Sequence, residues 1–549
     1  MGDAGFSSTT TTPPTPAALR AAPAEVYGNN ADKPANQVAQ RITPTRTAQP
    51  TSAALGARAL LAGQLARLLL TMLSTAVLAR LLTPDAFGMV ASTLAVTGIA
   101  GAFGATGGLS MAAMRAPQLT RDHWNLLFWC NTALGCVLTL GMAVGAPFIS
   151  ARLGNDHISS YLAVASLIFL FNGIAVQFKV RLIREGRFSK IAALETAGMA
   201  TGLAVAVILA ATIGGPWPLI LQVVIAAAFE LVAFAAAAGQ APGRLKLRVG
   251  GRELVRDGAV FAASTIIESS AHNIPVMALG ATASPAMVGV FTRAERLTTL
   301  PQHQLAMPLY RLAIPLLSKL HGQQLALKIR MLMAAYGYSV GVLSAIVGGM
   351  AASSVALALG GQWTELAPPI VRVLAVGVTL MAVTLPLRWG LVARGSAKLV
   401  FWLQLAYTVI ISAGALLAAP RLGAVGVAWA FAGATALRAA TYLVVAPRNI
   451  RMPVGSYFAS LWRLLLLLFL IFAGTAGIEL WAAFDSPLIT LMLGIAWAVG
   501  VLGLGCLVSR EARADATAAA NWALSIAGTA KRIGASSNSF PPAARAAQF

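Results

Sequence analysis

The chain has 549 residues, of which 58% are apolar and only 11% are charged, and its mean hydropathy is +0.75. An ordinary soluble domain carries about 25% charged residues, so a water-exposed surface over most of this chain is excluded. The formal net charge of +22 is typical of Lys and Arg concentrated in cytoplasmic loops of a membrane protein, and nucleic acid is not expected as a partner. The three cysteines lie in apolar runs and predict neither a disulfide framework nor a metal site: Cys130, Cys136 and Cys506.

The two ends of the chain differ from the rest in composition. Residues 1–54 are rich in Thr, Pro, Ala, Asn and Gln, which predicts a disordered cytoplasmic tail. A basic start followed by a short apolar core, as in a secretory signal peptide, is missing, so we expect the first hydrophobic segment to remain as a membrane anchor. Residues 511–549 are predicted to form a second cytoplasmic tail.

Between the tails, long apolar segments follow one another. A helix that crosses about 30 Å of hydrocarbon needs roughly 20 apolar residues. Only helices suit these segments, because every backbone polar group in lipid must be paired within the protein. The sequence therefore predicts an all-α polytopic membrane protein with about 14 transmembrane helices, at 57–81, 87–112, 124–149, 159–180, 190–213, 217–239, 257–280, 287–314, 328–351, 366–391, 398–419, 424–446, 458–480 and 487–509.

Basic residues alternate between the predicted loops. Every second loop is basic, and the intervening loops hold little more than Arg80, Arg152 and Arg421. The positive-inside rule then places the basic loops and both termini in the cytoplasm. Because no loop is long enough for a folded catalytic domain, we expect a transporter and not an enzyme. The basic residues that define this pattern are Arg115, Arg121, Lys179, Arg181, Arg184, Arg187, Lys190, Arg244, Lys246, Arg248, Arg252, Arg256, Lys319, Lys328, Arg330, Arg394, Lys398, Arg448 and Arg451.

A short pattern recurs after the first and the seventh predicted spans. Thr83–Gly88 and Ser284–Gly289 both read hydroxyl–Pro–x–x–apolar–Gly, in which the hydroxyl can cap a helix and Pro suits its first turn. A second, glycine-containing pattern recurs before spans six and twelve, at Gly214–Trp217 and Gly423–Gly426. Internal repeats are typical of transporters. We predict two pseudo-symmetric six-helix lobes, an N-lobe at 55–240 and a C-lobe at 241–450, followed by spans 13 and 14 at 451–510.

Polar residues inside the spans are the candidate site. Ionisable groups in a membrane are costly and usually face a cavity or a partner, and residues three or four apart share one helix face. Arginine also suits an anionic group, because its guanidinium matches phosphate oxygens. The alternative is that each residue pairs with a neighbouring helix or reaches the interface, which we favour for Glu195, Glu230 and Arg438. The candidates for a cavity between the lobes are Gln64, Arg67, Thr71, Ser74, Thr265, Glu268, Ser269, His272, Arg293, Arg296, Arg311 and Arg372.

Several stretches, in order along the chain, resemble one family. They are Arg80–Gly88 (R-L-L-T-P-x-x-F-G), Leu127–Asn131 (L-F-W-x-N), Arg184–Phe188 (R-x-x-R-F), Gly215–Leu219 (G-x-W-x-L), Phe291–Ala294 with Leu300–Pro301, Arg311–Ser318 (R-x-x-x-P-x-L-S) and Gly361–Trp363. The chain is similar to the Wzx-type oligosaccharide flippases in the polysaccharide export branch of the multidrug/oligosaccharidyl-lipid/polysaccharide exporter superfamily.

The resemblance implies a two-lobed helical bundle that works by alternating access. It implies as substrate an undecaprenyl-diphosphate-linked oligosaccharide, moved to the periplasm for exopolysaccharide or lipopolysaccharide biosynthesis. Membrane lipids and the polysaccharide polymerase or export machinery are the implied partners. No cofactor is expected. Thr106, Ala271 and Pro275 stand where the family tends to carry charged residues, so coupling to a proton or sodium gradient through the usual residues is an open question.

Three other classes of protein remain as alternatives. The first is a cation-coupled drug exporter of the same superfamily, which would favour a carboxylate-rich cavity over a cationic one. The second is a membrane polymerase or ligase, which would need a long periplasmic loop. The third is a structural membrane subunit without a transport path.

Overall fold

A computed structural model describes residues 50–102, 110, 113, 120–239, 241–244, 252–450, 454–481, 486–509, 513 and 517. The side chains of 50–65, 252–261, 307–308, 311–312 and 454–460 lie outside the described residues, as do most of the two predicted tails. Everything below concerns the unit Pro50–Phe549.

Helices make up almost all of the described chain, and no strand occurs among the described residues. The first half contains α1 (Pro50–Leu81), α2 (Pro84–Ala102), α4 (Arg121–Arg152), α5 (Ile158–Ala165), α6 (Leu167–Arg184), α7 (Phe188–Thr212) and α8 (Trp217–Ala238). The second half contains α9 (Arg252–Gly280), α10 (Pro285–Ser318), α11 (Gly322–Tyr336), the π-helical turn η1 (Gly337–Gly341), α12 (Val342–Gly349), α13 (Ala351–Ala358), the 3₁₀ turn η2 (Gly361–Trp363), α14 (Ala367–Ala393) and α15 (Ala397–Ile450), and it is followed by α16 (Val454–Trp481) and α17 (Pro487–Val508). The all-α fold class is confirmed.

Ten of the described helices are long and apolar enough to cross a membrane. One of the ten, α15, contains both predicted spans 398–419 and 424–446, and its helical path is interrupted at Gly423, where φ is +57°. Because this left-handed conformation is strained for residues with a Cβ, a glycine is needed at that break. Helices α1, α9 and α10 are not among the ten, so the count of about 14 stays a prediction.

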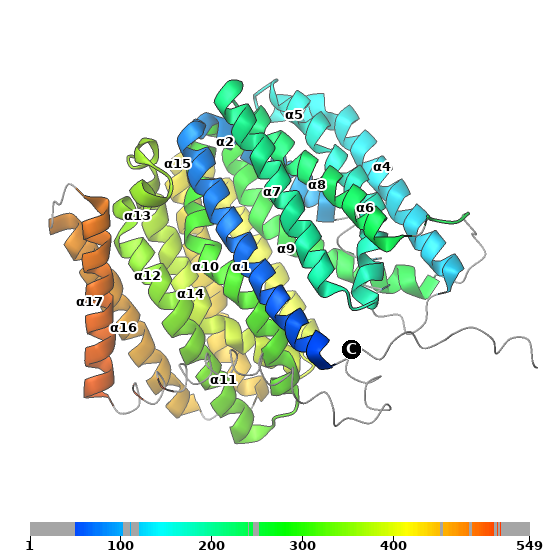
Figure 1. Cartoon of the computed structure of the whole chain (residues 1–549). Helices are drawn as coiled ribbons and strands as arrows, with labels where there is room; N and C mark the ends of the chain where they lie inside the picture. The colour runs from blue at the N-terminus through cyan, green and yellow to red at the C-terminus, as the bar shows by residue number, and fades with distance from the viewer. Residues whose placement is uncertain are drawn as a thin grey trace, which may run out of the picture. The chain divides into compact units, whose positions relative to one another are not determined.

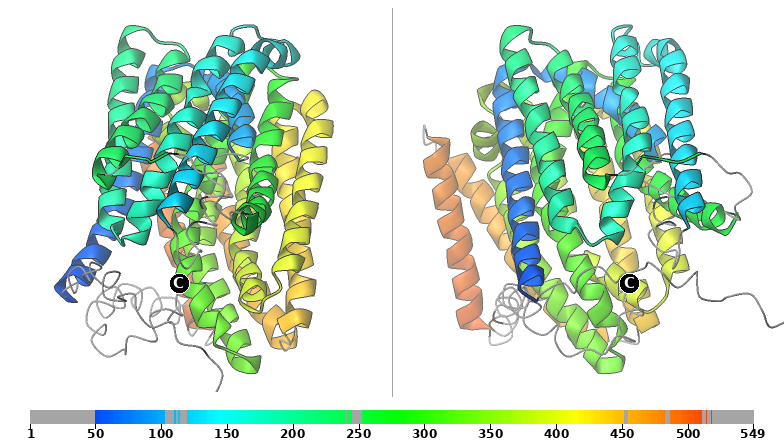
Figure 2. Two further views of the ribbon diagram at one scale, coloured as in Figure 1. Left: turned by 90° about the vertical axis from the view of Figure 1, so that its right-hand side faces the viewer. Right: turned by 45° about the vertical axis from the view of Figure 1, so that its right-hand side comes forward.

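The helices run roughly along one common direction, as Figures 1 and 2 show. The same packing pattern occurs in both halves: α1 packs on α7 as α9 packs on α15, and α4 packs on α6 as α11 and α12 pack on α14. Helices α16 and α17 pack beside α12 and α13, at the left edge of Figure 1. The lobe boundaries at 240 and 450 stay predictions, but the packing agrees with an internal repeat.

Local capping explains where the second helix of each half begins. Both α2 and α10 start at a proline, Pro84 and Pro285, whose missing N–H would be unpaired in the first turn in any case. Ser284 caps α10 by accepting a hydrogen bond from the N–H of Met287, and Thr83 accepts one from Ala86. The equivalent helices α2 and α10 therefore begin with the same proline and the same hydroxyl cap.

Candidate functional site

Two neighbouring cavities lie between the first half and helices of the second half. The first has a volume of about 430 Å³ and is lined by Arg67, Thr71, Glu195, Met199, Gln222, Val223, Ala226, Glu230 and Gln304. The second, of about 450 Å³, is lined by α2, α4, α6 and α8 together with Thr265 and Ser269 of α9. Val223 belongs to both walls. Since Gln304 lies on α10, each cavity draws its wall from both halves of the chain.

Charged side chains meet at the first cavity. The guanidinium of Arg67 on α1 and the ammonium of Lys179 on α6 both form ion pairs with the carboxylate of Glu195 on α7. Glu230 on α8 lies on the same wall. The side chain of Glu195 is 14% exposed, whereas those of Arg67 and Lys179 are 34% and 37% exposed. The two cations therefore remain partly accessible while they share one carboxylate.

The polar stripe predicted on span one continues from Arg67 toward the C-terminal end of α1. Thr71 is buried and donates from Oγ1 to the carbonyl oxygen of Arg67 at 2.8 Å. Ser74 accepts a hydrogen bond from Nε2 of Gln222 at 3.1 Å, which links α1 to α8. Arg67 and Thr71 line the cavity, and Ser74 is bonded to a residue that lines it.

The second cavity has a polar wall without formal charge among its lining residues. Ser269 on α9 donates to the carbonyl oxygen of Gly98 on α2 at 2.9 Å, and the amide nitrogen of Asn273 donates to the Ser269 hydroxyl at 3.0 Å. A Cβ at Gly98 would lie 2.8 Å from the Asn273 amide nitrogen. A larger residue at Gly98 would therefore displace the Asn273 amide where α2 and α9 approach. Thr265 and Ser269 of the predicted stripe line the cavity from α9.

The two repeat motifs touch each other where α2 begins and α10 begins. A Cβ added to Gly88 would lie 1.6 Å from the carbonyl oxygen of Pro285, and one added to Gly289 would lie 2.0 Å from that of Pro84. The contact is reciprocal, which is the geometry of a pseudo-two-fold axis between equivalent motifs. Backbone-to-backbone packing at this point brings the two halves together at one end of the bundle.

Hydrogen bonds between the halves strengthen this contact. Asp85 on α2 accepts a hydrogen bond at Oδ1 from the backbone N–H of Ala286 at 3.1 Å, so it caps the helix of the other half. The indole N–H of Trp363 donates to the carbonyl oxygen of Ala79 at 2.9 Å, and this indole is fully buried. Together these contacts form what we call the end closure, located at the end of the bundle where α1 ends.

Aromatic packing fills the space behind the end closure. The rings of Phe87 and Trp363 are edge to face, with centroids 5.5 Å apart. The guanidinium of Arg293 lies over the Phe87 ring at 4.5 Å, a cation–π contact. Its Nε is buried without a hydrogen-bond partner. Arg293, a predicted cavity residue, therefore packs against Phe87 and lines neither cavity.

A second polar group lies on α9 and α10. His272 Nδ1 is 3.8 Å from Glu295 Oε1, and the rings of His272 and His303 have centroids 6.2 Å apart. Glu268 and Arg296 are exposed side chains on the same two helices. None of these residues lines either of the two cavities, and their proposed roles in binding or proton coupling stay predictions.

Arg372 on α14 has a different neighbourhood. It pairs with Glu479 of α16 at 2.9 Å, and the other oxygen of that carboxylate accepts a hydrogen bond from the N–H of Ser353 at 2.9 Å. Arg372 thus ties α16 to the second half and lines neither cavity. The remaining two candidates cannot be placed, because the side chains of Gln64 and Arg311 lie outside the described residues.

The sequence analysis missed some of the residues at or next to the first cavity. Lys179 counted as part of a basic loop, yet it lies within α6 and pairs with Glu195. Gln222 and Gln304 had not been singled out, although a glutamine within an apolar span is a signal that could have found them. Glu195 was expected to pair with a neighbouring helix, and it does so with a residue of the cavity wall.

Known proteins identify the family. A family described as "Polysaccharide biosynthesis protein" matches residues 77–368, more than half of the chain. The chain belongs to this family. It is 22% identical over 395 residues to the lipopolysaccharide biosynthesis protein WzxC of Escherichia coli (strain K12), covering 70% of this chain and 79% of the relative. It is 30% identical over 167 residues to the succinoglycan biosynthesis transport protein ExoT of Rhizobium meliloti (strain 1021), covering 30% of this chain and 33% of that protein.

Solved structures agree with the fold. The lipid II flippase MurJ in an inward closed conformation superposes with a TM-score of 0.63 at 10% identity, covering 82% of this chain and 98% of MurJ. An inward-facing multidrug resistance MATE transporter gives a TM-score of 0.54 at 15% identity, covering 72% of this chain and 98% of the transporter. These two solved proteins are named as a flippase and a transporter. The family member described here is accordingly a multi-pass membrane protein with a transporter fold.

Proposed function

We propose that this chain is an inner-membrane flippase that moves an undecaprenyl-diphosphate-linked oligosaccharide from the cytoplasmic to the periplasmic leaflet, with both termini in the cytoplasm. The observation that carries this proposal is a pair of cavities that are lined by residues of both halves and contain polar side chains, in a bundle whose two halves are in backbone contact at the end closure. The loops at that end lack clusters of basic residues, which favours the periplasmic side. The relatives named for polysaccharide biosynthesis and lipid flipping support the substrate class.

The charges of the first cavity suggest how a diphosphate binds. When the site is empty, Arg67 and Lys179 face two carboxylates, Glu195 and Glu230, so the formal charges of these four residues balance. The cavity therefore acts as a cationic site only when a ligand replaces Glu195 as the partner of both cations. A diphosphate has the charge and the oxygens for this exchange, since guanidinium binds phosphate in a bidentate fork. Between transport cycles, the carboxylate of Glu195 compensates the positive charges of Arg67 and Lys179 and holds their side chains in place.

The experiment compares Arg67→Ala with a matched control. We expect Arg67→Ala to reduce polymer export at least about tenfold, because a hydrogen bond to a charged group is worth about 1.5–3 kcal/mol. Arg421→Ala removes an exposed arginine whose only described bond is to the carbonyl of Leu417 one turn away, and it should export normally. Membrane levels of both variants are compared by immunoblot. Normal export by Arg67→Ala at normal membrane levels would exclude the exchange of partners.

A cation-coupled drug exporter is the second candidate, and one observation favours it. Two carboxylates, Glu195 and Glu230, line the first cavity, and such exporters need acidic residues for a cationic cargo. The two functions predict different results for the variant Glu195→Gln, each in its own assay. A drug exporter should lose drug resistance in intact cells, whereas the flippase should keep its affinity for an anionic lipid because the cations remain.

A further inference from the structure

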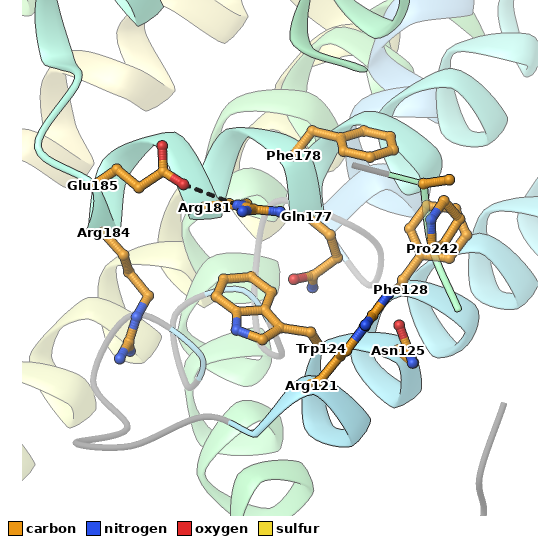
Figure 3. Close-up of a pocket in the computed structure, with 11 residues that line it drawn as sticks. Arg121, Trp124, Asn125, Phe128, Gln177, Phe178, Arg181, Arg184, Glu185 and Pro242 are labelled. Carbon is orange, nitrogen blue, oxygen red and sulfur yellow. Dashed lines mark hydrogen bonds and ion pairs between the residues drawn. The ribbon is translucent and has the colours of Figure 1, made fainter. Parts of the chain in front are cut away.

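A third cavity lies at the opposite end of the first half from the end closure. It has a volume of about 500 Å³ and is shown in Figure 3. Its walls come from the first two turns of α4, the last turns of α6 and the segment that follows α8, and they include Arg121, Trp124, Gln177 and Arg184. It shares no lining residue with the two central cavities. This cavity, which we call the α4–α6 pocket, opens beside the loops that the charge pattern places in the cytoplasm.

The α4–α6 pocket has a positive lining. Three arginines, Arg121, Arg181 and Arg184, face one carboxylate, Glu185. That carboxylate is bound on one oxygen by Arg181 at 2.9 Å and on the other by Arg187 at 3.1 Å, so its own charge is already offset. Arg121 has no hydrogen bond or ion pair with any other residue in the described part of the chain. It is also the first residue of α4, where the helix dipole adds a partial positive charge.

A buried amide without a partner points into the α4–α6 pocket. The side chain of Gln177 is only 4% exposed, and neither its Nε2 nor its Oε1 has a hydrogen-bond partner. Figure 3 shows this amide facing the space between Arg181 and Trp124. Leaving a buried amide unpaired is unfavourable, and a ligand with both donor and acceptor atoms would remove that penalty.

The remaining wall is aromatic and already in place. Trp124 and Phe128 lie on α4 and Phe178 lies on α6, and the rings of Phe128 and Phe178 are 5.8 Å apart. The segment after α8 closes the pocket because the N–H of Gly243 donates to Asn125 at 2.9 Å and the carbonyl oxygen of Gly243 accepts from the Trp129 indole at 3.0 Å. The pocket therefore needs little rearrangement to bind, which lowers the free energy lost on ordering.

We propose that the α4–α6 pocket binds a phosphate-bearing polyol or sugar head group. The phosphate lies against Arg121, the Gln177 amide bonds hydroxyls of the polyol, and the indole of Trp124 covers its apolar face. Arg184 already donates to the carbonyl oxygen of Ala113 at 2.9 Å and adds positive charge to the lining. This combination of a guanidinium, one amide and an aromatic ring distinguishes the ligand from a bare inorganic anion, which would leave the amide unpaired. The site is separate from the central cavities, so it does not depend on the flippase proposal.

The test uses the purified full-length protein in detergent, with binding followed by intrinsic tryptophan fluorescence. The probes are short-chain phosphatidylglycerol, soluble glycerol phosphate and inorganic phosphate. Arg121→Gln and Gln177→Leu are compared with Arg421→Gln, an exposed arginine in another part of the chain. We expect each pocket variant to weaken binding at least about tenfold and the control to bind like the unaltered protein.

The probes separate the sources of the ligand. Saturable binding of phosphatidylglycerol alone assigns the pocket to a lipid head group, and binding of glycerol phosphate as well assigns it to a soluble ester of the same chemistry. Binding of inorganic phosphate with the affinity of either ester, or unchanged binding by both pocket variants, would overturn the proposal. Gln177→Leu also guards against simple unfolding, because loss of an unpaired buried amide should leave the thermal midpoint of the empty protein equal or higher.

Discussion

At Gly88 and Gly289 the two halves touch through their backbones, and no side chain fits there. A Cβ at Gly88 would overlap the carbonyl of Pro285, and overpacking of this kind typically costs about 1–3 kcal/mol. In a protein that alternates between two states, the penalty falls on the closed state alone. Under the proposed transport cycle, in which the end closure lies on the periplasmic side, we therefore expect Gly88→Ala to shift the population toward the state open to that side by roughly 5- to 150-fold.

The measurement is thiol labelling from outside the cell. In a background with Cys130, Cys136 and Cys506 replaced by Ala, Ser269→Cys reports on the second cavity. A membrane-impermeant maleimide should react faster when Gly88→Ala is present. Gly141→Ala is the matched control, because a Cβ at Gly141 meets nothing within 4 Å. Equal labelling rates in the Gly88 and Gly141 variants would show that this contact does not control access.

Helix periodicity was sufficient to bring some residues to the cavity walls and insufficient for others. Arg67 and Thr71 lie four residues apart on one face of α1, and Thr265 and Ser269 do so on α9, so each pair reaches a wall as its spacing indicated. The pairing of Arg67 with Glu195 depends on α1 lying against α7, which is a contact between segments far apart in sequence. No local pattern reports such a contact. Their part in substrate binding stays a prediction.

The appended helices α16 and α17 are joined to the second half by a charged contact as well as by apolar packing. Glu479 is the partner of Arg372 and also caps the N–H of Ser353, and its side chain is 8% exposed. Removing one partner leaves the other in an apolar setting, which costs about 1–3 kcal/mol. We expect Arg372→Ala to lower the thermal midpoint of the detergent-solubilised protein by several degrees, with binding to the first cavity unchanged.

Removing both charges of this ion pair together should restore most of the lost thermal stability. A variant that combines Arg372→Met with Glu479→Gln removes both charges and keeps similar volumes, and replacement of a buried pair by neutral groups is often close to neutral. The thermal midpoint of this double variant should lie nearer to that of the unaltered protein than the midpoint of either single variant does. If Arg372→Ala melts at the original temperature, then the ion pair does not hold α16 in place.

At the scale of elements, the sequence was sufficient to predict that the segments are helices and in which order they follow, but it was not sufficient to predict where the helices end. The apolar segment 328–351 is one predicted span, yet it comprises α11, η1 and α12, and a π-helical turn depends on packing that propensity does not encode. The two spans within α15 were separated correctly, because a glycine motif marks the break at Gly423. Arg372 illustrates the limit: an arginine in a span signals a partner, but the sequence does not say whether that partner is a substrate or another helix.

For the whole molecule, the proposed flippase cycle requires the end closure to open and close in every turnover. Asp85 and Ala286 face each other across it, joined by a 3.1 Å hydrogen bond between the Asp85 carboxylate and the Ala286 N–H. In the cysteine-free background, Asp85→Cys and Ala286→Cys together should form a disulfide under oxidising conditions and hold the two halves closed. A covalent link of this kind opposes any state in which α2 and α10 separate. We expect polymer export to stop on oxidation and to return after reduction.

Two comparisons make that result specific. Each single cysteine variant should export with or without oxidant, which excludes general oxidative damage and loss of the Asp85 cap. Accumulation of the lipid-linked sugar in the cytoplasmic leaflet of the oxidised double variant would place the block at translocation and not at synthesis. Continued export while gel mobility shows a complete cross-link would mean that α2 and α10 stay together throughout transport. In that case the cargo would have to leave by a path other than the end closure, and the alternating exposure of the central cavities would have to be abandoned.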